Sequence, residues 1–301
     1  MGLRAVAGAP GLVLFALVLL GAESLAADSV DIIGEVRVHR VAGDETLLDV
    51  ARDNGLGYVE LIAANPGTDP WLPGRGRLVL LPSAHIVPAW PREGIVINLA
   101  DQRLYYFPAK GVAPLSYPIG IGQIGRETPL GTTTVKKKRV KPTWIPTPSI
   151  RAENPELPPV VPPGPDNPLG EFALDLGWPE YAIHGTNKPF SIGRLLTAGC
   201  IRLYPEDIAE LFARTKIGMR VTVIDQPFKF GWRGGDLYLE AHPTQAQAES
   251  LEASGRLQPE SIPDLVTQVM DAGHTVFQRL DWDAIRRAAH ERRGIPVRIT
   301  R

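Results

Sequence analysis

The sequence predicts a mainly β protein in three parts. We expect a small β-α-α-β domain over residues 35–84, a β-sandwich-like domain with one helix over residues 93–226, and a partly helical tail over residues 227–301. Two observations support this division. Hydrophobic periodicity becomes strand-like after residue 93, and helical stretches return beyond residue 245. With 301 residues, of which 44% are hydrophobic, the chain is long enough for about two packed domains.

The N-terminus has the pattern of a secretory signal peptide. Arg4 precedes an apolar run at residues 12–20, and small residues follow up to Ala26. We therefore expect residues 1–26 to be removed by cleavage after Ala26 or Ala27. The alternative is an uncleaved anchor, but the run is shorter than the roughly 20 residues that a span needs. No stable membrane span is expected after cleavage, and the net charge of −1 predicts no nucleic-acid partner.

Residues 35–84 carry the periodicities of two strands and two helices. Residues 35–39 alternate polar and apolar side chains, and residues 78–82 form a second strand-like run that ends in proline. Asp44 is placed to cap the first helix, and Asn65-Pro66 ends the second. The predicted order is therefore strand, helix, helix, strand.

This region resembles a LysM repeat, the small glycan-binding module of cell-wall proteins. The matching residues are Gly43-Asp44-Glu45-Thr46-Leu47, Ala64-Asn65-Pro66, Pro73-Gly74 and the run at residues 78–82. The resemblance implies that residues 35–84 bind wall glycan. The alternative is a generic α+β unit that only supports the next domain.

The central region is predicted to be a series of strands interrupted by a proline-rich loop. Strand-like runs lie at residues 95–99, 104–107, 116–122, 132–138, 172–174, 181–183 and 220–224, and one helix begins at Pro205. Residues 141–170 contain ten of the 29 prolines and are not expected to enter a helix or a sheet interior. Because strand-like sequence resumes after them, we expect an ordered loop beside the active site. In the tail, we expect one strand at residues 236–240, helices at 245–255, 261–271 and 282–292, and a supporting role.

Cys200 is the only cysteine in a chain that we expect to be exported. It cannot form an internal disulfide, so it is either a buried small hydrophobe or a nucleophile. His184 lies sixteen positions earlier and is the candidate base. An imidazole stabilises a thiolate and returns its proton to a leaving amine, which is the chemistry that an acyl-transferring cysteine needs.

The residues beside these two supply further groups. No acid adjoins the histidine, so we expect the backbone carbonyl of Gly185 to orient the imidazole. Gly199 permits a tight turn, and the backbone amides of Ala198, Gly199 and the cysteine itself are expected to form an oxyanion hole. Arg202 is expected to bind a substrate carboxylate, although an ordinary surface ion pair would fit the same spacing.

These motifs resemble the catalytic domain of bacterial L,D-transpeptidases, especially the LysM-containing subgroup of the Gram-negative envelope. The matching runs are His184-Gly185-Thr186-Asn187, Thr197-x-Gly199-Cys200-Ile201-Arg202-Leu203, and residues 117–122, 128–131 and 162–170. Many members carry a histidine at the position of Ala198. Because that histidine is not the base, we expect activity to survive its absence.

The resemblance implies a peptidoglycan-modifying enzyme of the periplasm that needs no cofactor and no metal. Cys200 would attack the diaminopimelate carbonyl of a tetrapeptide stem, release D-alanine, and pass the acyl group to an amine. That amine would be a second diaminopimelate, giving a 3→3 cross-link, or a lysine of an outer-membrane lipoprotein. The resemblance also assigns substrate binding to Thr197, Thr186, Asn187 and Tyr117, beside Arg202.

Two other functions remain open at this point. With water as the acceptor, the same thioester would make the protein a carboxypeptidase or an amidase. A non-catalytic wall-binding protein is the other alternative, and the presence of both His184 and Cys200 argues against it. The six histidines lack the spacing of zinc ligands, and thioredoxin-type redox chemistry needs a second cysteine.

Overall fold

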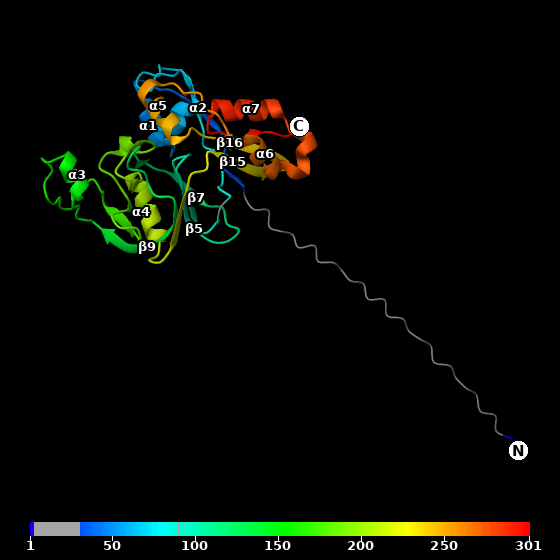
Figure 1. Ribbon diagram of the computed structural model, residues 1–301, viewed down its shortest axis with the longest axis horizontal. Helices are drawn as coiled ribbons and strands as arrows, with labels where there is room; N and C mark the ends of the chain where they lie inside the picture. Colours follow the sequence, from blue (N-terminus) through cyan, green and yellow to red (C-terminus); the bar gives the residue numbers. More distant parts are fainter. Residues whose placement is uncertain (3–30, 90) are drawn as a thin grey trace.

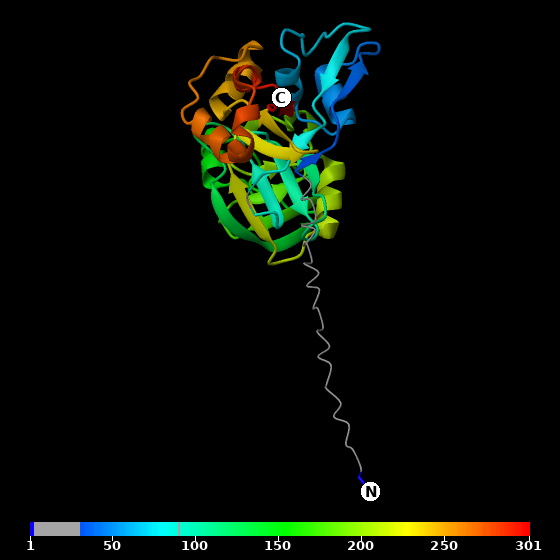
Figure 2. The same ribbon diagram turned by 90° about the vertical axis from the view of Figure 1, so that its right-hand side faces the viewer.

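The computed structural model describes residues 1–2, 31–89 and 91–301. Apart from its first two residues, the predicted signal peptide lies outside this described part. In the described part, no helix is long and apolar enough to cross a lipid bilayer. An N-terminal unit and the C-terminal tail lie next to each other above a large central sheet (Figures 1 and 2).

Residues 31–89 form a small unit of two helices and two short antiparallel ladders. Its elements are β1 (Ile32–Ile33), β2 (Arg37–Arg40), α1 (Leu47–Asp53), α2 (Tyr58–Ala64), β3 (Leu78–Leu81) and β4 (His85–Ile86). β2 pairs with β3, which gives the β-α-α-β order that the sequence predicted, and β1 pairs with β4. The helix cap differs from the prediction. Thr46, and not Asp44, accepts the Asp49 N–H at 3.2 Å, and the Asp49 carboxylate accepts the Thr46 N–H in return.

An eight-stranded sheet forms the centre of the molecule. Its strands are β5 (Gly94–Asn98), β6 (Arg103–Phe107), β7 (Leu115–Pro118), β9 (Gly131–Val140), β10 (Phe172–Leu176), β11 (Ala182–His184), β13 (Ile201–Arg202) and β14 (Arg220–Ile224). In space they follow the order β13-β11-β10-β9-β14-β5-β6-β7. Directly after β7, Gly120 exchanges two backbone hydrogen bonds of 2.9 Å with Arg202 of β13. The two edges of the sheet therefore approach each other.

The central region is thus one curled sheet, and the expected pair of facing sheets is not present in the described residues. Strand twist explains the difference, because a long twisted sheet curls on itself and encloses a core on one side. β8 (Ile121–Gly122) and β12 (Leu195–Thr197) form a separate parallel ladder beside the gap. The single helix expected after the cysteine is α4 (Pro205–Arg214), which begins with the predicted proline and has its apolar side in the core.

The proline-rich loop at residues 141–170 is ordered and contains one short helix, α3 (Pro148–Glu153), at one end of the molecule (Figure 1). Our expectation that these prolines exclude helix was wrong, because Pro148 occupies the first helical position, where its missing N–H costs nothing. The buried Asn167 amide donates to the carbonyls of Pro142, Val161 and Pro162. These bonds hold the two ends of the loop together.

The tail forms a second hydrophobic core of its own. Its elements are β15 (Phe228–Arg233), β16 (Asp236–Ala241), α5 (Gln245–Ser254), α6 (Leu265–Gly273), the 3₁₀ helix η2 (His274–Arg279), α7 (Trp282–Glu291) and β17 (Val297–Arg298). β16 and the three helices were predicted, whereas β15 and β17 were not. α5 leaves this core and packs against α2 and β12. The tail therefore contacts both the N-terminal unit and the β8–β12 ladder of the central region.

A buried cluster of charged side chains joins these three parts. The Lys229 ammonium from the tail lies 2.7 Å from the Asp101 carboxylate of the central sheet and 3.0 Å from Glu240. Nearby, Arg103 lies 2.9 Å from Glu60 of α2. All five side chains are almost fully buried. Burial alone would raise the pKa of Glu240, but the Lys229 ammonium, together with His242 and His85, outweighs it and holds this pKa well below its usual value.

Candidate active site

The parallel strands β11 and β13 bring the segments that carry the predicted histidine and cysteine side by side. His184 is paired with Arg202, and Ile183 with Ile201. Both isoleucines are fully buried in the core. Because side chains alternate along a strand, His184 and Arg202 project from the opposite face. Cys200 directly precedes β13, and the charge of Arg202 acts on the pKa of both the imidazole and the thiol.

The imidazole of His184 is held by its own backbone. Its Nδ1 lies 2.6 Å from the carbonyl oxygen of Gly185, the group that we expected to orient the ring. An Nδ1–H that donates to this carbonyl leaves Nε2 as the basic nitrogen. Burial lowers the pKa of His184 to about 3, with the positive charge of Arg202 as the next cause. The resting imidazole is therefore neutral near pH 7.

The thiol of Cys200 is also neutral at rest. Burial raises its pKa, although the Ala182 N–H and the Arg202 charge favour the thiolate. Sγ donates to the backbone carbonyl of Glu180 at 3.5 Å. Glu180 has a positive φ of 69°, which turns the chain between β10 and β11 toward the cysteine. At rest the site therefore holds a neutral thiol and a neutral imidazole rather than a preformed ion pair.

Residues 197–200, which we call the Cys200 loop, are bent sharply at Gly199. This glycine has φ of +100°, and a Cβ there would lie 2.6 Å from the Tyr181 ring. Its N–H donates to Thr197 Oγ1 at 3.1 Å. The prediction that all three amides of the loop serve an oxyanion hole is therefore wrong for Gly199, because the threonine hydroxyl already binds its N–H. The amides of Ala198 and Cys200 remain as candidates.

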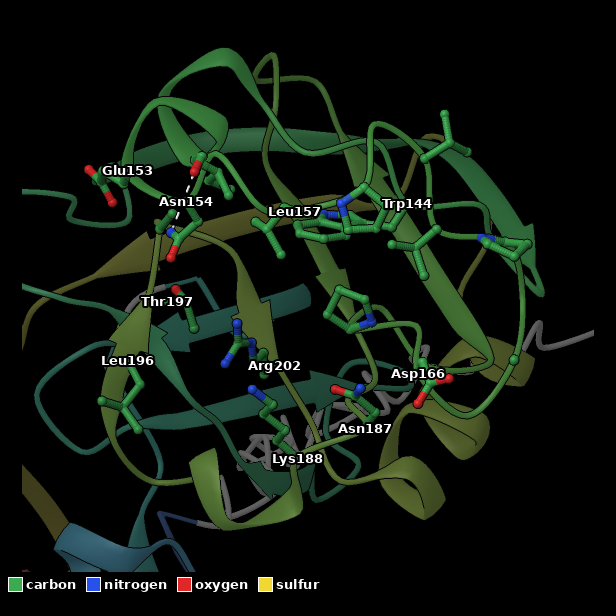
Figure 3. A pocket seen from close by; sticks show the side chains of 18 of the residues that line it. Trp144, Glu153, Asn154, Leu157, Asp166, Asn187, Lys188, Leu196, Thr197 and Arg202 are labelled. Atoms are coloured by element: carbon green, nitrogen blue, oxygen red, sulfur yellow. Dashed lines mark hydrogen bonds between the residues drawn. The ribbon is translucent and has the colours of Figure 1, made fainter.

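A cavity of about 840 Å³ opens between the Cys200 loop and the proline-rich loop. Figure 3 shows Arg202, Lys188 and Asn187 on one side of it and Trp144 on the other. Thr197 and Ala198 also line it. A volume of this size suits an extended peptide end, and the proline-rich loop lies beside the predicted active site as expected.

Arg202 has an unsatisfied hydrogen-bond donor at this cavity. Its Nε is buried and has no hydrogen-bond partner in the described structure. None of the ion pairs among the described residues includes this guanidinium. Buried donors are nearly always satisfied, so an unpaired one that lines a cavity points to a ligand acceptor. A carboxylate is the matching group.

Two of the predicted substrate-binding residues are not available to a substrate. Tyr117 is buried, and its hydroxyl donates to the Glu210 carboxylate of α4 at 2.9 Å. Thr186 is also buried, and its hydroxyl accepts the Lys188 N–H at 2.9 Å. Both residues belong to matching motifs, but the curl of the sheet and a local turn direct them inward. Thr197 lines the cavity, yet its hydroxyl is occupied within the Cys200 loop.

The sequence analysis missed several groups around the cavity. Lys188 adds a second cation, and Trp144 adds an aromatic wall. Arg126, from the segment after β8, forms an ion pair with Glu153 of α3 and so connects this segment to the proline-rich loop. The sequence offered only one sign of this segment, the run at residues 128–131, which is one of the matching motifs.

Comparison with known proteins identifies the family of this chain. A family model described as the L,D-transpeptidase catalytic domain matches residues 92–223. The probable L,D-transpeptidase YcfS of Escherichia coli is 38% identical over 280 residues, which cover 90% of this chain and 85% of YcfS. The probable L,D-transpeptidase YbiS of Escherichia coli is 41% identical over 261 residues, which cover 83% and 81% of the two chains.

Among solved structures, the catalytic domain of the Enterococcus faecium L,D-transpeptidase is similar with a TM-score of 0.35 and 24% identity. The match covers 44% of this chain and 96% of that domain. L,D-transpeptidase 3 of Mycobacterium tuberculosis gives a TM-score of 0.36 at 16% identity, covering 49% and 67%. On the sequence relationships, the chain belongs to the L,D-transpeptidase family, a family of cysteine-dependent enzymes.

Proposed function

We propose that this protein is a periplasmic L,D-transpeptidase that acts on peptidoglycan stem peptides, with Cys200 as nucleophile and His184 as proton carrier. The observation that carries the proposal is the pairing of β11 with β13. His184 and Arg202 are paired across these strands, Cys200 directly precedes β13, and Arg202, whose buried Nε has no partner in the described structure, lines the 840 Å³ cavity. These are a nucleophile, a base and a carboxylate-binding group in one site.

In the first step, Cys200 Sγ attacks the diaminopimelate carbonyl of a tetrapeptide stem. The S–H proton passes to His184 Nε2 as the S–C bond forms, so that no free thiolate is needed beforehand. The negative oxygen is stabilised by the amides of the Cys200 loop that remain free. When the C–N bond breaks, His184 returns the proton to the nitrogen of the departing D-alanine, and a thioester remains.

Arg202 connects substrate binding to this proton transfer. Its positive charge is one reason why the pKa of His184 is low at rest. A substrate carboxylate on the guanidinium offsets that charge and raises the pKa of the imidazole. The base thus becomes stronger when the substrate is bound, because an opposite charge has been added next to the cation.

In the second step, an amine attacks the thioester. His184 takes one proton from the amine and gives it to sulfur as the S–C bond breaks, which restores the thiol. The amine is that of a second diaminopimelate or a lipoprotein lysine. The proline-rich loop supports transfer over hydrolysis, because a loop held across the cavity limits the access of water to the thioester.

The N-terminal unit at residues 35–84 is proposed to bind wall glycan, as its LysM-like order suggests. Trp71 and Leu72, which follow α2, are 56% and 80% exposed. Exposed apolar side chains of this size suit stacking against sugar rings. Binding of insoluble peptidoglycan by the intact protein and by Trp71→Ala tests this role.

The experiment for the enzymatic proposal is incubation of the purified protein with a diaminopimelate-containing disaccharide tetrapeptide, followed by mass spectrometry. We expect dimers that have lost one D-alanine, and none with Cys200→Ala. Tripeptide without dimer would identify a hydrolase. No turnover by the intact protein, with either amine acceptor supplied, would contradict the proposal and favour a wall-binding role.

A further inference from the structure

We infer that Thr128 is a positioning residue for this reaction: its hydroxyl fixes the Gly199–Cys200 peptide so that the Cys200 N–H points at the developing oxyanion. The inference rests on the proposed function, because it concerns the acylation of Cys200. Thr128 does not line the cavity and touches no reacting atom. It acts through one backbone carbonyl of the Cys200 loop.

The contact is a buried hydrogen bond between distant parts of the chain. Thr128 is 3% exposed, and its Oγ1 donates to the Gly199 carbonyl oxygen at 2.8 Å, across 71 positions of sequence. Thr128 Oγ1 in turn accepts the Gly122 N–H at 3.4 Å. A single hydroxyl therefore ties the end of β8 to the residue before the nucleophile.

A second threonine fixes the two neighbouring peptides of the loop. Thr197 Oγ1 accepts the Gly199 N–H at 3.1 Å and donates to the Cys200 carbonyl at 2.7 Å. The Ala198–Gly199 and Cys200–Ile201 peptides are thereby held by local contacts. The peptide between them, Gly199–Cys200, is held by a residue from outside the loop, and that residue is Thr128.

The orientation of the Cys200 N–H follows from the planarity of this peptide. In a trans peptide the C=O and the N–H point in opposite directions. With the Gly199 carbonyl turned toward Thr128, the Cys200 N–H must point away from Thr128. The Thr128 hydroxyl is needed because Gly199 has no Cβ, so its own backbone resists rotation of the Gly199–Cys200 peptide only weakly. Gly199 already has φ of +100°.

Thr128 is itself firmly placed. Pro129 follows it and restricts its backbone to extended conformations. The Gln123 N–H donates to the Thr197 carbonyl at 3.0 Å, so the segment that carries Thr128 is bound to the Cys200 loop at a second point. A flip of the Gly199–Cys200 peptide would leave a buried hydroxyl and a carbonyl without partners, which is unfavourable.

The test compares two reactions of the same sulfur in the full-length protein. Acylation by the carbapenem ertapenem passes through an oxyanion, whereas alkylation by iodoacetamide does not. For Thr128→Val we expect the acylation rate constant to fall about 10-fold to 100-fold, less than the 10²–10³-fold loss of a whole oxyanion donor. Alkylation should stay within about twofold of the unchanged protein, and kcat for the tetrapeptide should fall with little change in KM.

Thr128→Ser keeps the hydroxyl and should restore acylation to within a few-fold. Thr222→Val is the matched control, because Thr222 is an equally buried threonine whose hydroxyl lies 3.5 Å from that of Thr132 on β9. It should leave both reactions unchanged. Melting temperatures verify that each variant is folded.

Three results would overturn the inference: equal acylation by Thr128→Val, parallel losses of acylation and alkylation, or failure of a folded Thr128→Ser to recover. Failure of the proposed function would look different. In that case the unsubstituted protein would form no acyl-enzyme and would not convert the tetrapeptide.

Discussion

Arg202 and His184 occupy paired positions on the parallel strands β13 and β11, so a permanent cation lies beside the imidazole of the site. After burial, this cation is the largest cause of the low pKa of His184. The protein thus holds this imidazole neutral, and the partner of its Nδ1 is the Gly185 carbonyl at 2.6 Å, which carries no full charge.

The first prediction concerns this pairing. Arg202→Met should raise the pKa of His184 above its value of about 3, because the nearest positive charge is removed. Chemical shifts of the His184 ring protons, followed by NMR from pH 2 to pH 8, measure it. Arg139→Met is the control, because Arg139 lowers the same pKa less, and a smaller rise is expected. An unchanged pKa in Arg202→Met would contradict the electrostatic account.

The second prediction concerns the resting thiol. Because burial raises the pKa of Cys200, iodoacetamide should react more slowly with the protein than with glutathione at pH 7. The rate should rise about tenfold per pH unit up to pH 9, as the thiolate fraction grows. Mass spectrometry follows the single adduct, and Cys200→Ala gives the background. A plateau below pH 8 would show a preformed thiolate instead.

The third prediction concerns Gly199. Gly199→Ala adds a Cβ 2.6 Å from Tyr181 Cε1 at a φ of +100°, so both a clash and backbone strain are expected. We expect a loss of about 1–3 kcal/mol in the free energy of unfolding. Gly125→Ala is the matched control, since Gly125 has φ of +85° but no atom within 4 Å of the added Cβ. Denaturant unfolding of both variants separates the clash from the strain, and equal losses would exclude the clash.

The fourth prediction concerns the buried charge cluster. Lys229→Met leaves Asp101 and Glu240 without their shared ammonium, and we expect a loss of about 3–5 kcal/mol in unfolding free energy at pH 7. Lys216→Met, at an exposed lysine, should change stability by less than about 0.5 kcal/mol. Urea unfolding at pH 7 compares the two.

The pH dependence of the same variant has a definite sign. In the unchanged protein the pKa of Glu240 is depressed, so its stabilising contribution is present above the unfolded pKa and is lost as the pH falls. Without Lys229, burial raises the pKa values of Asp101 and Glu240. Protonation of these carboxyl groups at lower pH then favours the folded state over the unfolded state. The stability difference between the two proteins should therefore shrink from pH 7 to pH 4. A constant difference would contradict this reasoning.

Residue chemistry alone was sufficient to select Cys200 and His184 as candidates, and the pairing of β11 with β13 brings the segments that carry them together. A lone cysteine and a histidine on a strand-like run are informative without any structure, because few other roles suit them. The β-α-α-β unit and the helix after the cysteine were also predictable from periodicity and capping residues. These features depend on local sequence.

The features that were missed depend on contacts between distant segments. Nothing in the run around Tyr117 shows that the sheet curls and turns this ring toward Glu210 of α4. The bond between Thr128 and Gly199 spans 71 positions and leaves no periodic pattern. The sequence does not show that Lys229 and Glu240 are buried, because the same residue types form ion pairs on protein surfaces.

The origin of Lys229 has a practical consequence for anyone who wishes to excise the catalytic part. A fragment ending at residue 223, where the family match stops, would retain Asp101 in its interior but lack the lysine that neutralises it. It would also lack α5, the tail helix that packs against α2 and β12. We therefore expect a fragment that ends at the border of the family match to fold less stably than the full chain, because a buried part of its charge balance is encoded beyond that border.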